Sequence, residues 1–352
     1  FNPFALEEGL QHLKALYLSE GFLEFKLLSK DSDIVHFSEN NRSARVSVKI
    51  FEGPRIKVGE IKFNGLKQTQ SFVVEREVLM HSGDWWIGSN VHDVEINLRK
   101  LGIFTEVKIV PAPSARGIEF RDMVIELKEA EPGIIEAGPG FRSDLGIRTF
   151  ARLSYNNIFG RNWIASLSGE ANRRLTNEYR FIEYNFDASF IEPRFFSTKN
   201  LYSFDISTKK QRFPVPSSVN AVATQLSTGF QRKIIKILSA KVIYGIERIR
   251  QFDARFNNLD SPNDNRSILI GSVTPGISLD TRDSPFTTTR GILSSISLEY
   301  ANPALSGQML SDKNAPDYQK WTGSIHGYIP VTKDIIWSNV FSAGFLRSNS
   351  PD

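Results

Sequence analysis

Residues 163–172, WIASLSGEAN, decide the fold class. One set of alternate residues is apolar or small: Trp163, Ala165, Leu167, Gly169 and Ala171. The other set is polar: Ser166, Ser168, Glu170 and Asn172. Alternation with a period of two residues is typical of a β-strand with one face in an apolar environment and the other in water. The stretch also reaches the ~9–11 residues that a tilted membrane strand needs, whereas strands average about 5–6 residues in soluble proteins.

The same alternation recurs along the rest of the chain, at 182–190, 202–207, 295–300 and 337–345. The polar sets carry charges in mid-strand, such as Glu183, Asp187 and Asp205. The core of a soluble sandwich would exclude such charges, whereas the hydrated lumen of a membrane barrel accepts them. Turn signals between residues 134 and 347 predict about eleven strands joined as hairpins. Residues 133–352 therefore predict an antiparallel transmembrane β-barrel, and the odd number of strands indicates only part of one.

Residues 1–132 follow a different pattern, typical of α+β domains. Leucines at helical spacing predict a helix over residues 5–20, and two further helices are expected over 70–80 and 91–102, with strand-like stretches at 22–29, 45–54, 55–63, 105–111 and 121–129. Residues 21–27 and 103–109 are similar, as are 46–54 and 124–133, and their spacing of about 80 residues indicates tandem repeats. We expect a partial domain over 1–53, which lacks its first strand and helix, and a complete one over 54–132.

Composition and charge exclude several functional classes. The chain has 352 residues, 26 Phe and no Cys, which fits a compartment that oxidises thiols. Its net charge is +4, but Lys and Arg are dispersed and form no basic stripe, so nucleic acid is not an expected partner. The sequence contains no apolar run near the ~20 residues of a spanning helix and no visible signal peptide.

Four motifs in order resemble the BamA/TamA superfamily of outer-membrane assembly and translocation proteins. FEGP at 51–54, followed by IKVGEI at 56–61, is similar to the junction between its polypeptide-transport-associated (POTRA) repeats. GPGFRSDLG at 138–146 and SYNNIFGRN at 154–162 are similar to the first two barrel strands. The most specific motif is LDTRDSPF at 279–286 with Arg290-Gly291, which resembles a mid-barrel motif. The resemblance covers essentially the whole chain.

The resemblance implies POTRA repeats followed by about eleven of the sixteen barrel strands of the family, with the sixth-loop tip and the closing strand absent. It implies an outer-membrane protein with its POTRA domains in the periplasm that inserts β-barrel proteins into the outer membrane. Its partners would be unfolded outer-membrane clients, outer-membrane lipid and, at the POTRA repeats, accessory lipoproteins or a TamB-like protein. The polar stretches 252–267 and 302–318 would be extracellular loops.

Three sets of residues are expected to carry this function. A weak seam would make the first barrel strand a lateral gate that templates client strands, since its glycines lower strand stability: Ile134, Ile135, Glu136, Ala137, Gly138, Pro139, Gly140 and Phe141. The mid-barrel motif comprises Asp280, Thr281, Arg282, Asp283, Pro285 and Gly291. A POTRA edge strand would pair with extended clients: Thr105, Glu106, Val107, Lys108, Ile109 and Val110.

No enzymatic chemistry is expected. The five histidines have no metal-ligand spacing, no cysteine assists them, and no phosphate-binding, dinucleotide-binding or hydrolase motif occurs. Asp280, Arg282 and Asp283 resemble a catalytic cluster, but a salt-bridged strand end at the barrel rim explains them better. We therefore expect no catalytic residue, metal or cofactor.

Other interpretations of the sequence remain open. A two-partner secretion pore or an autotransporter-assembly translocase has the same repeats and a related barrel. An organellar homologue is compatible with the same motifs. A soluble, ligand-binding β protein is the alternative of a different class, and it would stay monomeric in buffer without detergent.

Overall fold

The computed structural model describes residues 2–29, 34–38, 43–143, 146–173, 182–213, 219–251, 267–284, 287–308, 315–332 and 334–349. It divides into two compact units. Unit 1 comprises residues 1–132 and 159–162, and unit 2 comprises residues 133–158 and 163–352. Among the described residues, no helix is both long enough and apolar enough to cross a membrane.

Unit 1 begins with helix α1 (Pro3–Ser19), whose first turn is capped by the Asn2 side chain, which accepts the Phe4 N–H at 3.0 Å. Four short strands follow: β1 (Lys26–Leu27), β2 (Val35–Phe37), β3 (Ala44–Val46) and β4 (Ile50–Phe51). β1 pairs with β4 and β2 with β3. The strand expected over 22–29 is therefore wrong in length, since only two of its residues find a partner. That residues 1–53 are a separate domain stays a prediction.

The rest of unit 1 has the predicted strand–helix–helix–strand–strand order. It consists of β5 (Lys57–Asn64), α2 (Ser71–Glu75), α3 (Gly88–Lys100), β6 (Phe104–Pro113) and β7 (Phe120–Glu129). The sheet order is β5-β7-β6, with β5 parallel and β6 antiparallel to β7. The helix expected over 70–80 ends early: the chain leaves it at Arg76, and Val78 and Met80 reach the core from the irregular stretch that follows.

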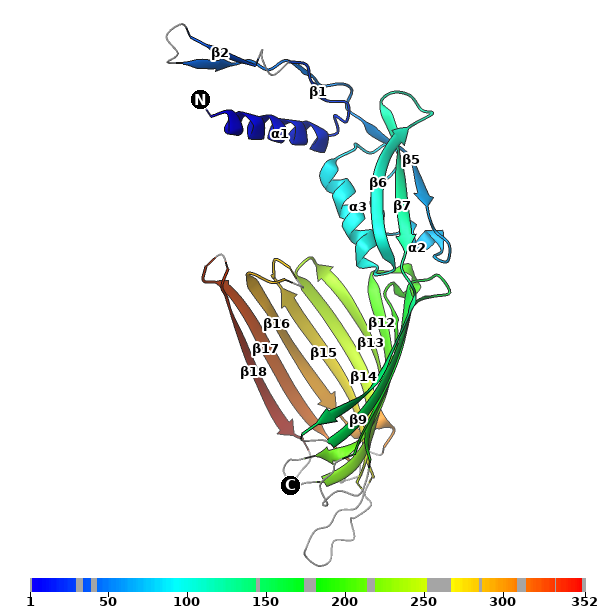
Figure 1. Cartoon of the computed structure of the whole chain (residues 1–352). Coiled ribbons are helices and arrows are strands. Elements are labelled where there is room, and N and C mark those ends of the chain that lie inside the picture. The colour runs from blue at the N-terminus through cyan, green and yellow to red at the C-terminus, as the bar shows by residue number, and fades with distance from the viewer. Residues whose placement is uncertain are drawn as a thin grey trace, which may run out of the picture. The chain divides into compact units, whose positions relative to one another are not determined.

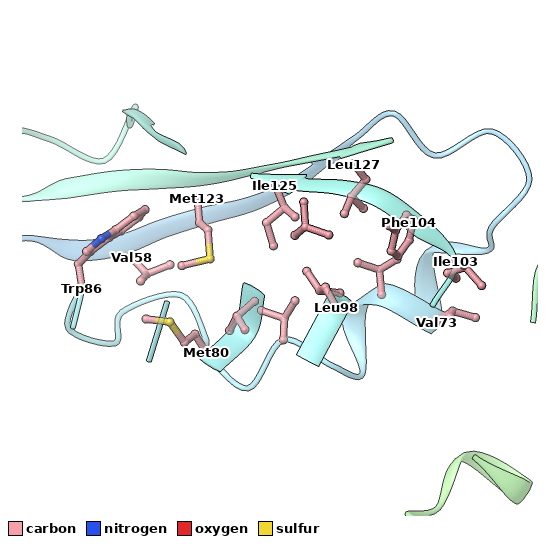
Figure 2. Packing of buried hydrophobic residues seen from close by; sticks show 14 of the residues in the cluster. Val58, Val73, Met80, Trp86, Leu98, Ile103, Phe104, Met123, Ile125 and Leu127 are labelled. Carbon is pink, nitrogen blue, oxygen red and sulfur yellow. The ribbon is translucent and has the colours of Figure 1, made fainter. Parts of the chain in front are cut away.

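A single apolar core holds this sheet and its helices together. Leu98 of α3 lies on the side of Met123 and Ile125 of the central strand β7 (Figure 2), and Val94, one helical turn earlier, is buried in the same cluster. The other buried members are Ile56, Val58, Val73, Val74, Val78, Met80, Trp86, Ile103, Phe104, Val107 and Leu127. Burial of side chains of this size contributes about 1.5–3 kcal/mol each, so the core dominates the stability of unit 1.

Unit 2 is one antiparallel sheet of tilted strands (Figure 1). Its eleven strands in the described residues are β8 (Gly133–Arg142), β9 (Gly146–Ile158), β10 (Trp163–Arg173), β11 (Glu183–Glu192), β12 (Asn200–Phe213), β13 (Val219–Ile235), β14 (Leu238–Gln251), β15 (Ser267–Asp280), β16 (Gly291–Ala301), β17 (Tyr318–Pro330) and β18 (Ile336–Ser348). Each strand pairs with the next along the chain, which confirms the predicted number of strands and their hairpin order.

The register of the strands separates two faces. One row across seven strands is apolar and defines the apolar face: Ile135, Leu153, Leu167, Ala188, Ile206, Leu226 and Ile246. The neighbouring row on the polar face is Glu136, Arg152, Ser168, Asp187, Ser207, Gln225 and Glu247. Large exposed side chains along the apolar face are tolerated where they meet lipid. Small hydroxyl pairs, such as Ser166 with Ser189 at 2.7 Å, line the polar face.

Of the two expected extracellular loops, 252–266 lies outside the described residues, as does 309–314. The described part of the second loop contains a short 3₁₀ helix, η3 (Pro303–Ser306), which follows β16. The Leu305 carbonyl accepts the Tyr244 hydroxyl at 2.6 Å, so this segment lies against the apolar face of β14.

Candidate functional site

β8 stands at one edge of the large sheet and contains all eight residues predicted as the lateral gate. It pairs with β9 from Gly133 opposite Tyr155 to Arg142 opposite Gly146. Unit 1 directly precedes β8 in the chain, so no earlier strand of unit 2 covers its other side. In the described residues, no strand pairs with the N–H and C=O groups on that side of β8.

Few side chains attach β8 to the sheet. Glu136 forms an ion pair with Arg152 at 3.2 Å on the polar face, and both side chains are more than half exposed. An exposed pair of this kind contributes about 0–1 kcal/mol. The ring of Phe150 lies beside Gly138, and a Cβ atom at position 138 would be 3.5 Å from it. With so few side-chain contacts, β8 is attached mainly through its backbone pairing with β9, although Pro139 has no N–H to donate to it.

The next strands are more strongly linked on the polar face. Arg148 of β9 donates to Glu170 of β10 at 2.6 Å, and Glu170 also accepts from Asn172 at 3.1 Å. Arg148 and Glu170 are half-buried and 22 residues apart in sequence, and no local motif revealed them. Their places in the polar set of alternate residues were the only indication in the sequence. That indication identifies the pair only when the register between β9 and β10 is known.

The mid-barrel motif forms a closed loop between β15 and β16. Arg282 makes two hydrogen bonds of 2.9 Å to the two carboxylate oxygens of Asp280. The Thr281 hydroxyl accepts the Ile292 N–H at 3.0 Å and lies 3.1 Å from the Ile292 carbonyl, to which it also donates. Pro285 lies outside the described residues.

Asp283 organises the same loop through the main chain. Its carboxylate accepts the N–H groups of Ser284 at 2.9 Å, Thr289 at 3.0 Å and Arg290 at 3.3 Å, and it also accepts the Thr289 hydroxyl. The hydroxyl of Thr289, followed by these N–H groups, holds the pKa of Asp283 well below its usual value. Both carboxylates of the motif are therefore engaged in contacts that hold the loop together.

β6 forms one edge of the smaller sheet and contains all six residues predicted as the POTRA edge strand. Val107 points into the core, whereas Thr105 and Glu106 are exposed. Pro111 and Pro113 lack N–H groups, so they end the stretch that can receive a further strand. β5 forms the opposite edge of the same sheet.

An irregular joint between β5 and β7 depends on one carboxylate. The register of the two strands shifts between Val58 and Ile61. There Asp122 of β7 accepts the Glu60 N–H at 2.9 Å and the Lys62 ammonium at 2.8 Å. A side chain at position 59 would start 2.3 Å from the same carboxylate, which is why Gly59 occupies it.

Acid is expected to weaken this joint. Hydrogen bonds from Lys62, then Ser114 and the Glu60 N–H, hold the pKa of Asp122 well below its usual value of 3.8. A carboxyl with a lowered folded pKa contributes stability above its unfolded pKa and loses it as the pH falls through the folded one. The contribution is therefore complete above about pH 5 and declines as the pH falls below about 4.

The test compares urea unfolding, followed by tryptophan fluorescence to which the buried Trp86 of unit 1 contributes, in the parent protein and in Asp122→Asn. The urea midpoints should differ at neutral pH and converge on acidification. Asp93→Asn, an exposed carboxylate of α3, is the control and should change little. A difference for Asp122→Asn that stayed constant from neutral pH down to pH values below the folded pKa would contradict this account.

In the described part of the chain, no group of three or more His, Asp or Glu side chains has an arrangement that could hold a metal ion. The edges of the two sheets, by contrast, offer backbone groups that can pair with a further strand. Such edges recognise extended polypeptide through N–H and C=O groups, with side chains adding selectivity.

Comparison with curated proteins gives distant relatives. The outer membrane protein assembly factor BamA of Neisseria meningitidis serogroup B is 23% identical over 297 residues, which cover 80% of this chain and 35% of the relative. The protein of the same name from Neorickettsia risticii is 29% identical over 164 residues, which cover 46% of this chain and 21% of the relative. The chain thus spans about a third or less of the length of these relatives.

Comparison with solved structures shows the fold. BamA from Haemophilus ducreyi lacking POTRA domains 1–3 superposes with a TM-score of 0.74 at 17% identity, over 99% of this chain and 65% of that chain. CdiB from Escherichia coli superposes with a TM-score of 0.51 at 14% identity, over 99% of this chain and 63% of that chain. The expected barrel-type sheet with POTRA-type domains is thereby confirmed as a fold.

The family model described as the Omp85 superfamily domain matches residues 157–351. This range is more than half of the chain and runs from the end of β9 through β18. Together with the order of the sheet and the shared fold, the match shows that the chain belongs to the Omp85 superfamily.

Proposed function

We propose that this chain is the membrane-proximal part of an assembly factor that inserts β-barrel proteins into the outer membrane, with β8 as the templating edge. The protein resides in the outer membrane, and its POTRA domains lie in the periplasm. The observation that carries the proposal is the position of β8, at an edge of the sheet and held mainly by its backbone pairing with β9. The names of the curated relatives support the same function.

The proposed mechanism uses strand pairing in place of chemistry. An unfolded client strand would pair with the free edge of β8, which satisfies its N–H and C=O groups as it enters lipid. The six residues of β6 would first hold extended clients in the periplasm. Nothing in this sequence of steps breaks a covalent bond, so the proposal includes no enzymatic activity and no cofactor. Accessory lipoproteins or a TamB-like protein would bind at the POTRA domains.

The test is site-specific photocrosslinking in the full-length protein. A benzoylphenylalanine residue replaces Ile135 on β8 or, as the matched control, Ile277 on β15. Both isoleucines are exposed on the apolar face, but β15 is paired on both sides. A radiolabelled outer-membrane barrel precursor should crosslink at position 135 and give only background at position 277. Equal yields at the two positions would rule out templating by β8.

The two-partner secretion pore, an alternative within the same superfamily, is distinguished in the same experiment. A secreted passenger passes through the lumen and would contact the polar face. Benzoylphenylalanine at Gln225, which belongs to the polar row, should then crosslink the passenger. A crosslink at 225 without one at 135 would replace insertion by secretion as the function.

A further inference from the structure

Aromatic side chains gather where β11 and β13 end and β12 begins, on the side of the sheet at which β8 begins. We call Phe195, Phe196, Tyr202 and Phe230 the aromatic cluster. The ring of Phe195 lies 5.0 Å from Tyr202 and 5.3 Å from Phe230, and Tyr202 lies 5.2 Å from Phe230. Tyr202 and Phe230 are register partners on the apolar face, so Phe195 folds outward over that face.

Phe196 is the outermost member of the aromatic cluster. Its ring is 4.5 Å from Phe195 and its residue surface is 82% exposed. Its φ of 48° is unusual for a residue with a bulky side chain. The turn thus presents a large apolar ring outward, an arrangement that water would penalise and that the boundary of a bilayer would favour.

The adjacent hairpin between β13 and β14 has the same character. Its two connecting residues are Lys236 and Ile237, whereas hairpin turns in water favour Asn, Asp and Gly. Ile234, Ile235 and Ile237 are all exposed. The β15–β16 loop at the same end of the sheet is different, since its Thr, Ser and Asp side chains satisfy its own backbone. The polar β15–β16 loop separates these two apolar turns from the β17–β18 hairpin, which also exposes Val331 and Ile335, so the two turns form one sector of the rim.

Three cations accompany this sector: Lys199, Arg232 and Lys236. Arg232 follows Phe230 by two residues and so shares its face. Lys199 and Lys236 lie in the turns that flank β12 and β13, and all three side chains are exposed. Lys233 faces the charge of Asp280 and is not included. Glu192 pairs with Tyr202 and adds one negative charge to this sector. The three cations outnumber it, so the net charge of these four residues is positive.

We propose that the aromatic cluster and these three cations bind the headgroup of an anionic phospholipid in the periplasmic leaflet. The rings of Tyr202 and Phe230 would lie beside the upper acyl chain, and the cations would reach the phosphate. A lipid is the expected ligand because the aromatic cluster is continuous with the apolar face that meets lipid. Basic groups near the level of the headgroups attract anionic lipids. The proposal requires only that the apolar face meets lipid, and it does not depend on client insertion.

The test measures lipid selectivity at the sector itself. Phe196→Trp is introduced into the full-length protein, which is reconstituted in phosphatidylcholine vesicles with or without phosphatidylglycerol. Quenching of the introduced indole by brominated phosphatidylcholine or brominated phosphatidylglycerol is measured after subtraction of the five native tryptophans, recorded in the parent protein. We expect strong quenching, with local enrichment of phosphatidylglycerol.

A matched pair of double variants then tests the cations. In the Phe196→Trp background, Lys199→Gln with Lys236→Gln should lower the enrichment about fivefold for each lysine removed, since each contributes about 1 kcal/mol near an anionic surface. Lys209→Gln with Lys241→Gln removes two lysines from the polar face and should leave the enrichment unchanged. All variants are compared only as the folded, heat-modifiable form seen in electrophoresis.

Three results would overturn the proposal. Absence of quenching by either brominated lipid would show that the sector does not contact the bilayer. Equal quenching by the two lipids in the Phe196→Trp protein would show contact without headgroup selectivity. An equal loss of selectivity in both double variants would show that the selectivity arises from the net charge of the protein and not from a site at this sector. Failure of the crosslinking at Ile135 would leave all of these results unaffected.

Discussion

Gly291→Ala is expected to leave most of the protein without a folded membrane sheet. Gly291 has a φ of 115°, which side chains rarely adopt, and holding another residue in such a region costs about 1–3 kcal/mol. A Cβ atom would also lie 2.5 Å from the Thr281 carbonyl oxygen and 2.7 Å from the Cα of Arg282. Both atoms belong to the backbone and cannot rotate away, so the start of β16 and the loop closed by Asp283 would have to separate.

The measurement is the fraction of full-length protein that migrates as the folded, heat-modifiable form after insertion into vesicles. Gly327→Ala is the matched control, because Gly327 lies inside β17 and its Cβ would meet no atom within 4 Å. That variant should fold like the parent. Parent-like folding of Gly291→Ala would show that the mid-barrel loop does not fix the pairing of β15 with β16.

Leu98→Ala is expected to have the largest effect in unit 1, a loss of about 2–5 kcal/mol in the free energy of unfolding. Leu98 is fully buried on α3, between that helix and the sheet, and its removal leaves a cavity in the cluster of Figure 2. Domains of this kind have a total stability of about 5–15 kcal/mol, so a loss at the upper end would unfold unit 1.

Urea unfolding of the full-length protein, followed by tryptophan fluorescence to which the buried Trp86 of unit 1 contributes, checks this value. Leu79→Ala is the control, because Leu79 is a leucine of the same unit that is 64% exposed. Exposed substitutions change stability by about 0.5 kcal/mol or less. Similar urea midpoints for the two variants would mean that unit 1 has no packed core at α3.

The faces of the large sheet were predictable from sequence because strand alternation is a local property. Residues 163–172, for example, form β10 almost residue for residue. What alternation cannot supply is the register between strands. A register shift beside Trp163 and hairpins of different lengths decide that Arg148 meets Glu170 and that Phe195 lies over Tyr202. These two contacts could be identified only from the structure.

Unit 1 was harder to predict at its short elements. The apolar pattern of residues 70–80 is compatible with a long helix, but only five residues are helical, because the core takes Val78 and Met80 from a non-helical stretch. The strand expected over 22–29 needs a partner along its whole length and finds one for two residues. The sequence singled out the mid-barrel motif but could not show the different contacts of its two aspartates: Asp280 binds a guanidinium and Asp283 binds backbone N–H groups.

The core described in Figure 2 lies entirely within unit 1. Its unfolding therefore transfers apolar surface from protein to water, which gives a large positive heat-capacity change and a stability that passes through a maximum with temperature. The apolar face of unit 2 meets lipid instead of water, so the hydration of apolar surface does not determine its stability in the same way. Cooling is therefore expected to weaken the hydrophobic contribution to unit 1 more than the lipid contacts of unit 2.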